Sequence, residues 1–147
     1  MQDELVLIAA PGFQSDHFSR DQFLASNLLL REQGSGSRRV VESALVKAGF
    51  ELKSFKNVMY LDSTEAIKSS VEVGLGVAFV SRWAISKELE LNALKVVYVS
   101  GVKVVRNFSL VLRTGPEPRG AASAFCTFAR ERARLLSGRQ SRSGSSG

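Results

Sequence analysis

Residues 28–41 read Leu-Leu-Leu-Arg-Glu-Gln-Gly-Ser-Gly-Ser-Arg-Arg-Val-Val, which is an apolar run, a short loop of glycine and serine, and the start of a helical pattern. The apolar run predicts a short buried strand, and the loop leads at once into the first turn of a helix. Free backbone N–H groups and the positive end of the helix dipole then face the space beyond the strand's carboxyl end. The stretch therefore predicts one wall of a binding site for a small anion, and we expect the facing wall to lie outside this chain.

The helix after this loop is defined by an apolar stripe at i, i+1, i+4, i+5 and i+8, which consists of Val40, Val41, Ala44, Leu45 and Ala48. Gly49 is the expected stop signal, and Ser37 stands where an N-cap residue belongs. Two interpretations of the loop stay open. It captures a ligand through backbone N–H groups and serine hydroxyls, or it is a helix cap after a tight turn, which needs only one serine and one glycine. Arg38 either adds charge to an anion site or faces the solvent, and we favour the solvent.

Strands and helices alternate along most of the chain. Strands are predicted at 5–10, 28–30, 58–61, 76–80, 95–99 and 107–112, and helices at 21–25, 38–48, 64–73, 82–89 and 119–136. The run at 5–10 is apolar throughout, as parallel strands buried on both faces are. This alternation predicts an α/β fold with a mostly parallel sheet, in which ligands lie beyond the carboxyl ends of the strands.

Composition and charge restrict the class of protein. The 147 residues are 44% hydrophobic and 23% charged, as in a soluble globular domain. The net charge of +6 is concentrated at the end of the chain, because residues 119–147 hold six Arg and one Glu whereas the preceding residues are nearly neutral. A basic terminal run is more often a solvated face than a DNA-reading surface, so we do not expect this chain to bind DNA by itself.

Location is indicated by three observations. No apolar run approaches the ~18 residues that span a bilayer. Met1 is followed by Asp3 and Glu4 rather than by a basic segment, so no signal peptide is expected. A single cysteine, Cys126, excludes an intramolecular disulfide framework. We therefore expect a cytoplasmic protein without membrane contact.

Two further segments are expected at the same sheet edge as the glycine-serine loop. Ser63 and Thr64 begin a predicted helix, and capping fully explains one of them, so a ligand role is the minority interpretation. Val80 and Ser81 end a predicted strand, where position supports a ligand contact although the residue types alone do not.

The chain lacks the usual signs of catalysis. His17 is the sole histidine and has no serine or cysteine nucleophile motif nearby, so chance placement is the better interpretation. The sequence contains no metal-ligand cluster, P-loop or G-x-S-x-G motif. We expect neither an enzyme nor a cofactor or metal. An enzyme on a two-lobed scaffold is kept as a minor alternative that depends on Asp62.

The order of three motifs resembles one family closely. The motifs are Leu-Arg-Glu-Gln-Gly-Ser-Gly-Ser-Arg-Arg at 30–39, Asp-Ser-Thr-Glu-Ala-Ile-Lys at 62–68 and Gly-Leu-Gly-Val-Ala-Phe-Val-Ser at 74–81. The opening at 4–12, the Phe-Ser-Leu-Val-Leu-Arg at 108–113 and the long final helix agree with them. Together they resemble the effector-binding domain of LysR-type transcriptional regulators over most of residues 3–136.

The resemblance implies a periplasmic-binding-protein type 2 fold, in which two α/β lobes joined by two crossing strands hold the effector between them. Residues 1–10 would then be one crossing strand, 11–106 the second lobe, 107–136 the return strand and the first lobe's last helix, and 137–147 a disordered or vector-derived tail. The winged helix-turn-helix, the linker helix and the opening βαβ of the first lobe are absent from this sequence, so DNA would be reached only through a domain that this chain lacks.

The implied function is that of a ligand-sensing regulatory domain for a small, anionic effector, transmitted through oligomer rearrangement. The effector-binding residues predicted by position and resemblance are Gly34, Ser35, Gly36, Ser37, Arg38, Ser63, Thr64, Val80 and Ser81. We also expect a homo-oligomer, because Phe125 and Phe128 lie on one face of the final helix. A stand-alone binding or self-associating module of the same fold remains the alternative.

Overall fold

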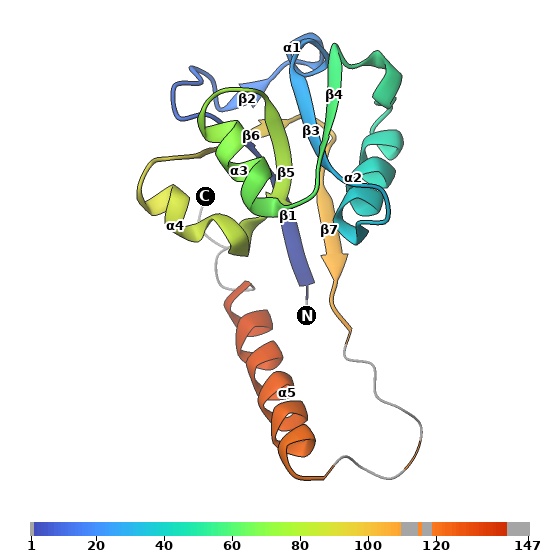
Figure 1. Ribbon diagram of the computed structural model, residues 1–147, viewed down its shortest axis with the longest axis vertical. Coiled ribbons are helices and arrows are strands. Elements are labelled where there is room, and N and C mark those ends of the chain that lie inside the picture. The colour runs from blue at the N-terminus through green and yellow to red at the C-terminus, as the bar shows by residue number, and fades with distance from the viewer. Residues whose placement is uncertain (1, 110–114, 116–118, 141–147) are drawn as a thin grey trace. The chain divides into compact units, whose positions relative to one another are not determined.

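The computed structural model describes residues 2–109, 115 and 119–140. It divides into two compact units (Figure 1). The larger unit runs from Asp3 to Arg106 and holds the sheet and four helices. The second takes Gln2 and the described residues from Asn107 onward, including the long helix α5 (Ala121–Gln140).

In the described part of the chain, seven strands form one sheet, in the order β2-β6-β1-β5-β3-β4 with β7 also paired to β1. The strands are β1 (Gln2–Ala9), β2 (His17–Phe18), β3 (Asn27–Arg31), β4 (Asn57–Leu61), β5 (Val77–Ser81), β6 (Lys95–Val99) and β7 (Val104–Asn107). The short strand β2 lies within the segment before the first helix, where no strand is predicted.

The sheet is mixed, and its exceptional strand is β1. The pairs β3–β4, β3–β5 and β2–β6 are parallel, but β1 is antiparallel to both β5 and β6. The parallel setting inferred for residues 5–10 is therefore wrong, although burial on both faces is confirmed for residues 5–9; Ala10 follows the end of β1 and is half-buried. An apolar run reports burial on two faces and carries no information on strand direction. Because Leu5 pairs with Ser81, the start of β1 lies beside the end of β5.

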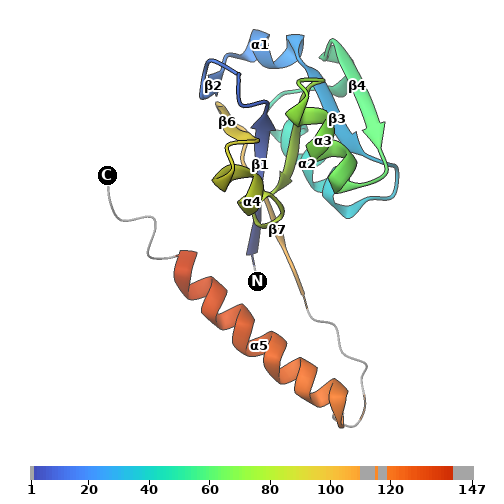
Figure 2. The same cartoon turned by 60° about the vertical axis from the view of Figure 1, so that its left-hand side comes forward.

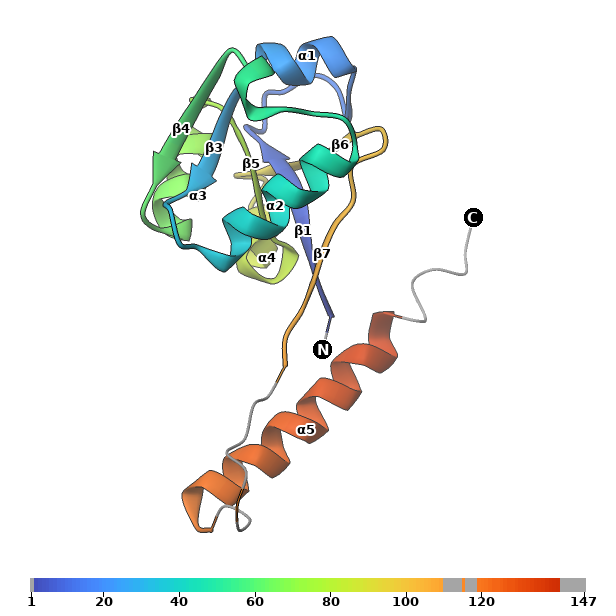
Figure 3. The same ribbon diagram turned by 90° about the vertical axis from the view of Figure 1, so that its right-hand side faces the viewer.

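Alternate residues of β1 pack into two separate hydrophobic cores, because successive side chains of a strand point to opposite faces of the sheet. Leu5, Leu7 and Ala9 pack in one cluster with residues of α2 (Gly36–Lys47) and with Phe23 of α1 (Arg20–Ala25). Val6 and Ile8 pack in the other, beneath α3 (Thr64–Glu72) and the turn Arg82–Ile85 that leads into α4 (Ser86–Glu90). Figures 2 and 3 show α2 on one face of the sheet and α3 with α4 on the other.

Helix ends follow local chemistry, with one correction. Ser19 caps α1 in a reciprocal capping box with Gln22, and Ser63 caps α3 by accepting from the backbone N–H of Ala66 at 3.0 Å. The cap of α2 is Ser35, whose side chain accepts from Arg38 N at 3.5 Å, so the assignment of Ser37 as N-cap is wrong. The helix starts two residues earlier than the predicted start at residue 38, because Gly36 and Ser37 belong to its first turn.

Other boundaries differ modestly from the predicted ones. The β-formers around 50–55 contain a short 3₁₀ turn, Leu52–Ser54, rather than a strand. The last strand is β7, and of the predicted 107–112 only Asn107 belongs to it; residues 110–112 lie outside the described residues. α5 extends to Gln140, past the expected end at 136, and residues 141–147 of the predicted tail are not described.

Candidate functional site

The glycine-serine loop turns sharply between β3 and α2. Gly34 has a φ of +94°, a conformation that glycine adopts without the penalty of a Cβ, and Ser35 N donates to Glu32 O across the turn at 3.3 Å. With Ser35 acting as the helix cap, the hydroxyl of Ser37 is available for another partner. The capping role therefore belongs to Ser35, and the role of the Ser37 hydroxyl is a separate question.

That partner is Arg106, and it begins a continuous hydrogen-bonded chain. Arg106 Nη1 donates to Ser37 Oγ at 2.7 Å, and Arg106 Nε donates to Asp3 Oδ2 at 2.7 Å. The other carboxylate oxygen of Asp3 accepts from Ser81 Oγ at 2.8 Å. Asp3 is 0% exposed, whereas both serines are half-buried and reachable from solvent. Two of the predicted segments, the loop at 34–38 and the end of β5, are thus joined through two residues of β1 and β7.

The sequence did not point to Asp3 or Arg106 as site residues. Both are charged residues in apolar strands. A buried charge without a partner is destabilising, so each of these residues indicates that an oppositely charged partner lies nearby. Their pairing spans 103 positions of the chain and depends on the alignment of β1 with β7, which no local pattern encodes.

Arg38 contacts residues other than the four that link Ser37 to Ser81. Its Nε lies 2.6 Å from Glu42 Oε1, and its guanidinium lies over the ring of Tyr60 at 4.3 Å from the centroid. The hydrogen bond that Arg38 donates to Glu42 is the main reason that the pKa of Arg38 is raised above its ordinary value. Its positive charge is balanced by a carboxylate of the same helix.

Ser63 and Thr64 both have structural partners. Ser63 caps α3, and Thr64 Oγ1 accepts from Arg31 Nη1 at 3.1 Å. Arg31 also forms a two-point ion pair with Glu32, at 2.7 and 3.0 Å. This hydrogen bond from Arg31 is the main cause of the lowered pKa of Glu32. The structure thus places a second polar group beside the start of α3, and its hydrogen bonds do not involve Ser37, Arg106, Asp3 or Ser81.

Val80 has a buried side chain. It is 4% exposed, pairs with Val6 and packs in the core cluster under α3. Because neighbouring residues of a strand point to opposite faces, Ser81 and not Val80 presents its side chain to the polar group at the end of β5.

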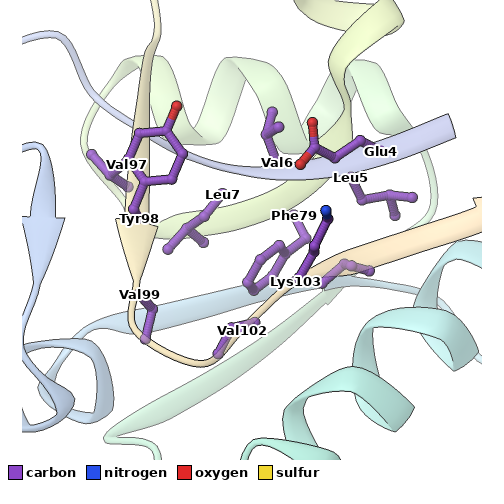
Figure 4. A pocket seen from close by; sticks show the side chains of 11 residues that line it. Glu4, Leu5, Val6, Leu7, Phe79, Val97, Tyr98, Val99, Val102 and Lys103 are labelled. Carbon is purple, nitrogen blue, oxygen red and sulfur yellow. The ribbon is translucent and has the colours of Figure 1, made fainter. Parts of the chain in front are cut away.

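A pocket lies away from the Ser37–Ser81 contacts, against β1 and the segment that joins β6 to β7 (Figure 4). Leu5, Leu7 and Phe79 supply part of its apolar lining, while Glu4 and Lys103 bring opposite charges to it. None of the predicted site residues lines it.

Possible metal ligands, His17 and the apolarity of the helices each bear on other kinds of function. Within the described ranges, no group of three or more His, Cys, Asp or Glu side chains is arranged to hold a metal ion. His17 is exposed and lies against Tyr98, with ring centroids 5.5 Å apart. A search of the described helices also finds none with the length and apolarity needed to cross a membrane.

Comparison with known proteins identifies the class. The family model described as the LysR substrate binding domain matches residues 1–134. The chain belongs to this family, and its fold is that of the periplasmic-binding-protein type 2 regulatory domains. It is therefore an effector-binding domain of the LysR type, as the three motifs predict.

Curated relatives show a likeness over most of the chain. A probable RuBisCO transcriptional regulator of Trieres chinensis is 34% identical over 116 residues, covering 76% of this chain and 38% of the relative. One from Guillardia theta is 37% identical over 134 residues, covering 89% and 42%. A protein named phosphonates import ATP-binding protein PhnC, of Anaeromyxobacter dehalogenans, is 38% identical over 131 residues, covering 88% and 26%. The chain thus spans well under half the length of these relatives.

Solved structures agree on the fold. The regulatory domain of Synechocystis CcmR in complex with 2-PG has a TM-score of 0.65 at 20% identity, covering 87% of this chain and 62% of that one. The bromide-bound regulatory domain of HypT from Salmonella typhimurium has a TM-score of 0.56 at 20% identity, covering 71% and 48%.

Proposed function

We propose that this domain binds a small anionic effector at the sheet edge between the start of α2 and the end of β5. The observation that carries the proposal is the chain of three hydrogen bonds from Ser37 through Arg106 and Asp3 to Ser81. It brings two serine hydroxyls and a guanidinium to one edge, next to the N-terminus of a 12-residue helix whose dipole favours anions. The facing wall of the cleft would come from residues outside this chain.

The nature of the ligand is supported by related structures. The CcmR domain was solved with 2-PG and the HypT domain with bromide, and both ligands are anions. In this chain, the backbone N–H groups of Gly36 and Ser37 and the Ser37 hydroxyl are the donors for such a group, because Ser35 N donates to Glu32 O and Arg38 N donates to Ser35 Oγ. Arg38, Ser63 and Thr64 could contact the ligand only after breaking their present interactions, so we do not include them among the residues that bind it directly.

Effector binding would act on the whole regulator by shifting its conformational equilibrium. A ligand changes that equilibrium only by the difference in its affinity for the two states. We propose that closure around the effector rearranges an oligomer and so repositions DNA-binding domains, which would belong to a segment outside this chain.

The test is a titration of ¹⁵N-labelled chain with 2-PG and, separately, with sodium sulfate, followed by NMR. We expect saturable shifts of the amides at 35–38 and 81, with weak affinity because one wall of the cleft is missing. Ser37→Ala should weaken binding several-fold. Ser69→Ala, an exposed serine of α3, is the matched control and should bind like the parent chain. Shifts spread over the surface, or none at all, would contradict the proposal.

Two alternatives remain for comparison. An enzyme on this scaffold depends on Asp62 being buried beside a hydroxyl, and Asp62 is exposed. A self-associating module is favoured by Phe125 and Phe128, which are 61% and 57% exposed on α5. Self-association is compatible with effector binding.

A further inference from the structure

The chain of contacts between Ser37 and Ser81 has a fixed direction. An arginine guanidinium only donates hydrogen bonds, so Ser37 Oγ must accept from Arg106. A carboxylate only accepts, so Ser81 Oγ must donate its hydrogen to Asp3. The other carboxylate oxygen of Asp3 accepts from the Nε–H of Arg106 at 2.7 Å. The ion pair therefore assigns opposite roles to two chemically identical side chains.

Each serine has the complementary capacity left for a ligand. A hydroxyl has one hydrogen and two acceptor lone pairs. Ser37 Oγ accepts from Arg106 through one lone pair, so its own hydrogen can be donated to a ligand. Ser81 Oγ donates its hydrogen to Asp3, so it can only accept a hydrogen bond from a ligand. Both side chains are half-buried, so a ligand at the edge can reach them.

We propose that Asp3 and Arg106 are positioning residues that make Ser37 a donor and Ser81 an acceptor, so that the preferred ligand is an anion that also carries a hydroxyl or amine donor. The anionic group would lie at Ser37 and the N-terminus of α2, and the donor group would lie at Ser81. The inference rests on the proposed effector site and adds the chemical class of its ligand. Because Asp3 is fully buried and its pairing is satisfied on both oxygens, reversing these roles in the parent chain would leave a buried charge without a partner.

The experiment uses two probes that differ by a single hydroxyl, propyl phosphate and 3-hydroxypropyl phosphate. Dissociation constants are measured with the full 147-residue chain by NMR titration. We expect the hydroxylated probe to bind roughly 2- to 10-fold more tightly, the range for one added hydrogen bond. The readout is the ratio of the two constants, which a general loss of stability does not change.

Variants then test the source of the preference. Ser81→Ala removes the acceptor and should bring the two dissociation constants together. Asp3→Asn keeps the shape but presents an amide N–H₂ to Ser81, which then accepts from Asn and gains a hydrogen to donate. A probe hydroxyl can accept that hydrogen, so this variant is tested with a third probe, 3-aminopropyl phosphate, whose ammonium only donates and which should lose its advantage over propyl phosphate. Ser69→Ala should keep the parent ratio. Two-dimensional NMR spectra verify folding, and if Asp3→Asn does not fold, Ser81→Ala decides.

The outcomes distinguish this inference from the function beneath it. If neither phosphate binds at 35–38 and 81, the anion site itself is wrong and this inference falls with it. If both probes bind there equally, or if the preference survives in Ser81→Ala, the anion site stands and the assignment of donor and acceptor roles is overturned.

Discussion

Gly76, in the turn that precedes β5, shows how closely two strands approach. A Cβ built at this position would collide with the carbonyl oxygen of Asn27, and would lie 3.0 Å from the Cβ of Asn27. The same asparagine donates to Leu75 O at 2.8 Å and accepts from Asn57 Nδ2 at 2.9 Å, so it has little freedom to move. Glycine is required here by contact with a neighbouring strand and not by an unusual φ angle.

Gly76→Ala is therefore expected to destabilise the domain by about 1–3 kcal/mol, the range for overpacking a tight site. Gly12→Ala is the matched control, since its added methyl group meets nothing within 4 Å, and its effect should stay within about 0.5 kcal/mol. Urea unfolding followed by circular dichroism measures both. Equal stability of the two variants would show that β3 and β5 can separate without cost.

At the scale of elements, α3 and α4 are joined by a buried lysine that the sequence did not single out. Lys68 Nζ lies 2.6 Å from Glu88 Oε1, 3.0 Å from Glu65 Oε1 and 3.1 Å from Ala84 O. Burial by itself lowers the pKa of Lys68, but the hydrogen bonds that Lys68 donates to Glu88 and Glu65 outweigh burial and raise its pKa above the ordinary value. The hydrogen bond to Lys68 is in turn the main reason that the pKa of Glu88 is lowered.

This pairing predicts a pH dependence of stability. Glu88 has a folded pKa below its ordinary value of 4.5, so its contribution is fully present above that pH and is lost as pH falls through the lower folded value. We expect Glu88→Gln to lower the free energy of unfolding by about 1–3 kcal/mol at pH 7 and to lose less than the parent chain between pH 5 and pH 3. Glu90→Gln, at an exposed position of the same helix, should follow the parent curve. Parallel curves for Glu88→Gln and the parent would contradict the role of the pair.

Elements with a local signal were predicted well, and arrangements set by distant pairing were not. The strand at 28–30, the helix stripe from Val40 and the stop at Gly49 follow from periodicity and turn chemistry, and the structure confirms them. The cap of α2 was misplaced because Ser35 and Ser37 are equivalent by type, and only Arg106 distinguishes them. The contribution of Asp3 to the candidate site depends on strand alignment, which the hydrophobic pattern leaves open.

At the scale of the whole molecule, surface apolarity bears on assembly. α5 presents Phe125 and Phe128, three positions apart and thus on one face, with exposed fractions of 61% and 57%. Side chains of this size dominate association energies when they become buried, and exposed apolar patches mark interaction surfaces. A regulator that transmits effector binding through an oligomer also needs contacts between copies, so self-association of the domain and its proposed function are compatible.

The chain is expected to self-associate through this face. Phe125→Ser combined with Phe128→Ser should shift the molar mass measured by light scattering toward the monomer by raising the dimer dissociation constant at least tenfold, which corresponds to about 1.4 kcal/mol. Ser123→Ala with Thr127→Ala changes two exposed residues of the same helix near the two aromatic positions and should leave the molar mass at each concentration unaltered. Anion binding by the double Phe variant, measured by the same NMR titration, should persist, because the Ser37–Ser81 chain lies wholly within the unit Asp3–Arg106. A parent chain that stays monomeric from micromolar to millimolar concentration would refute the association while leaving the effector site untouched.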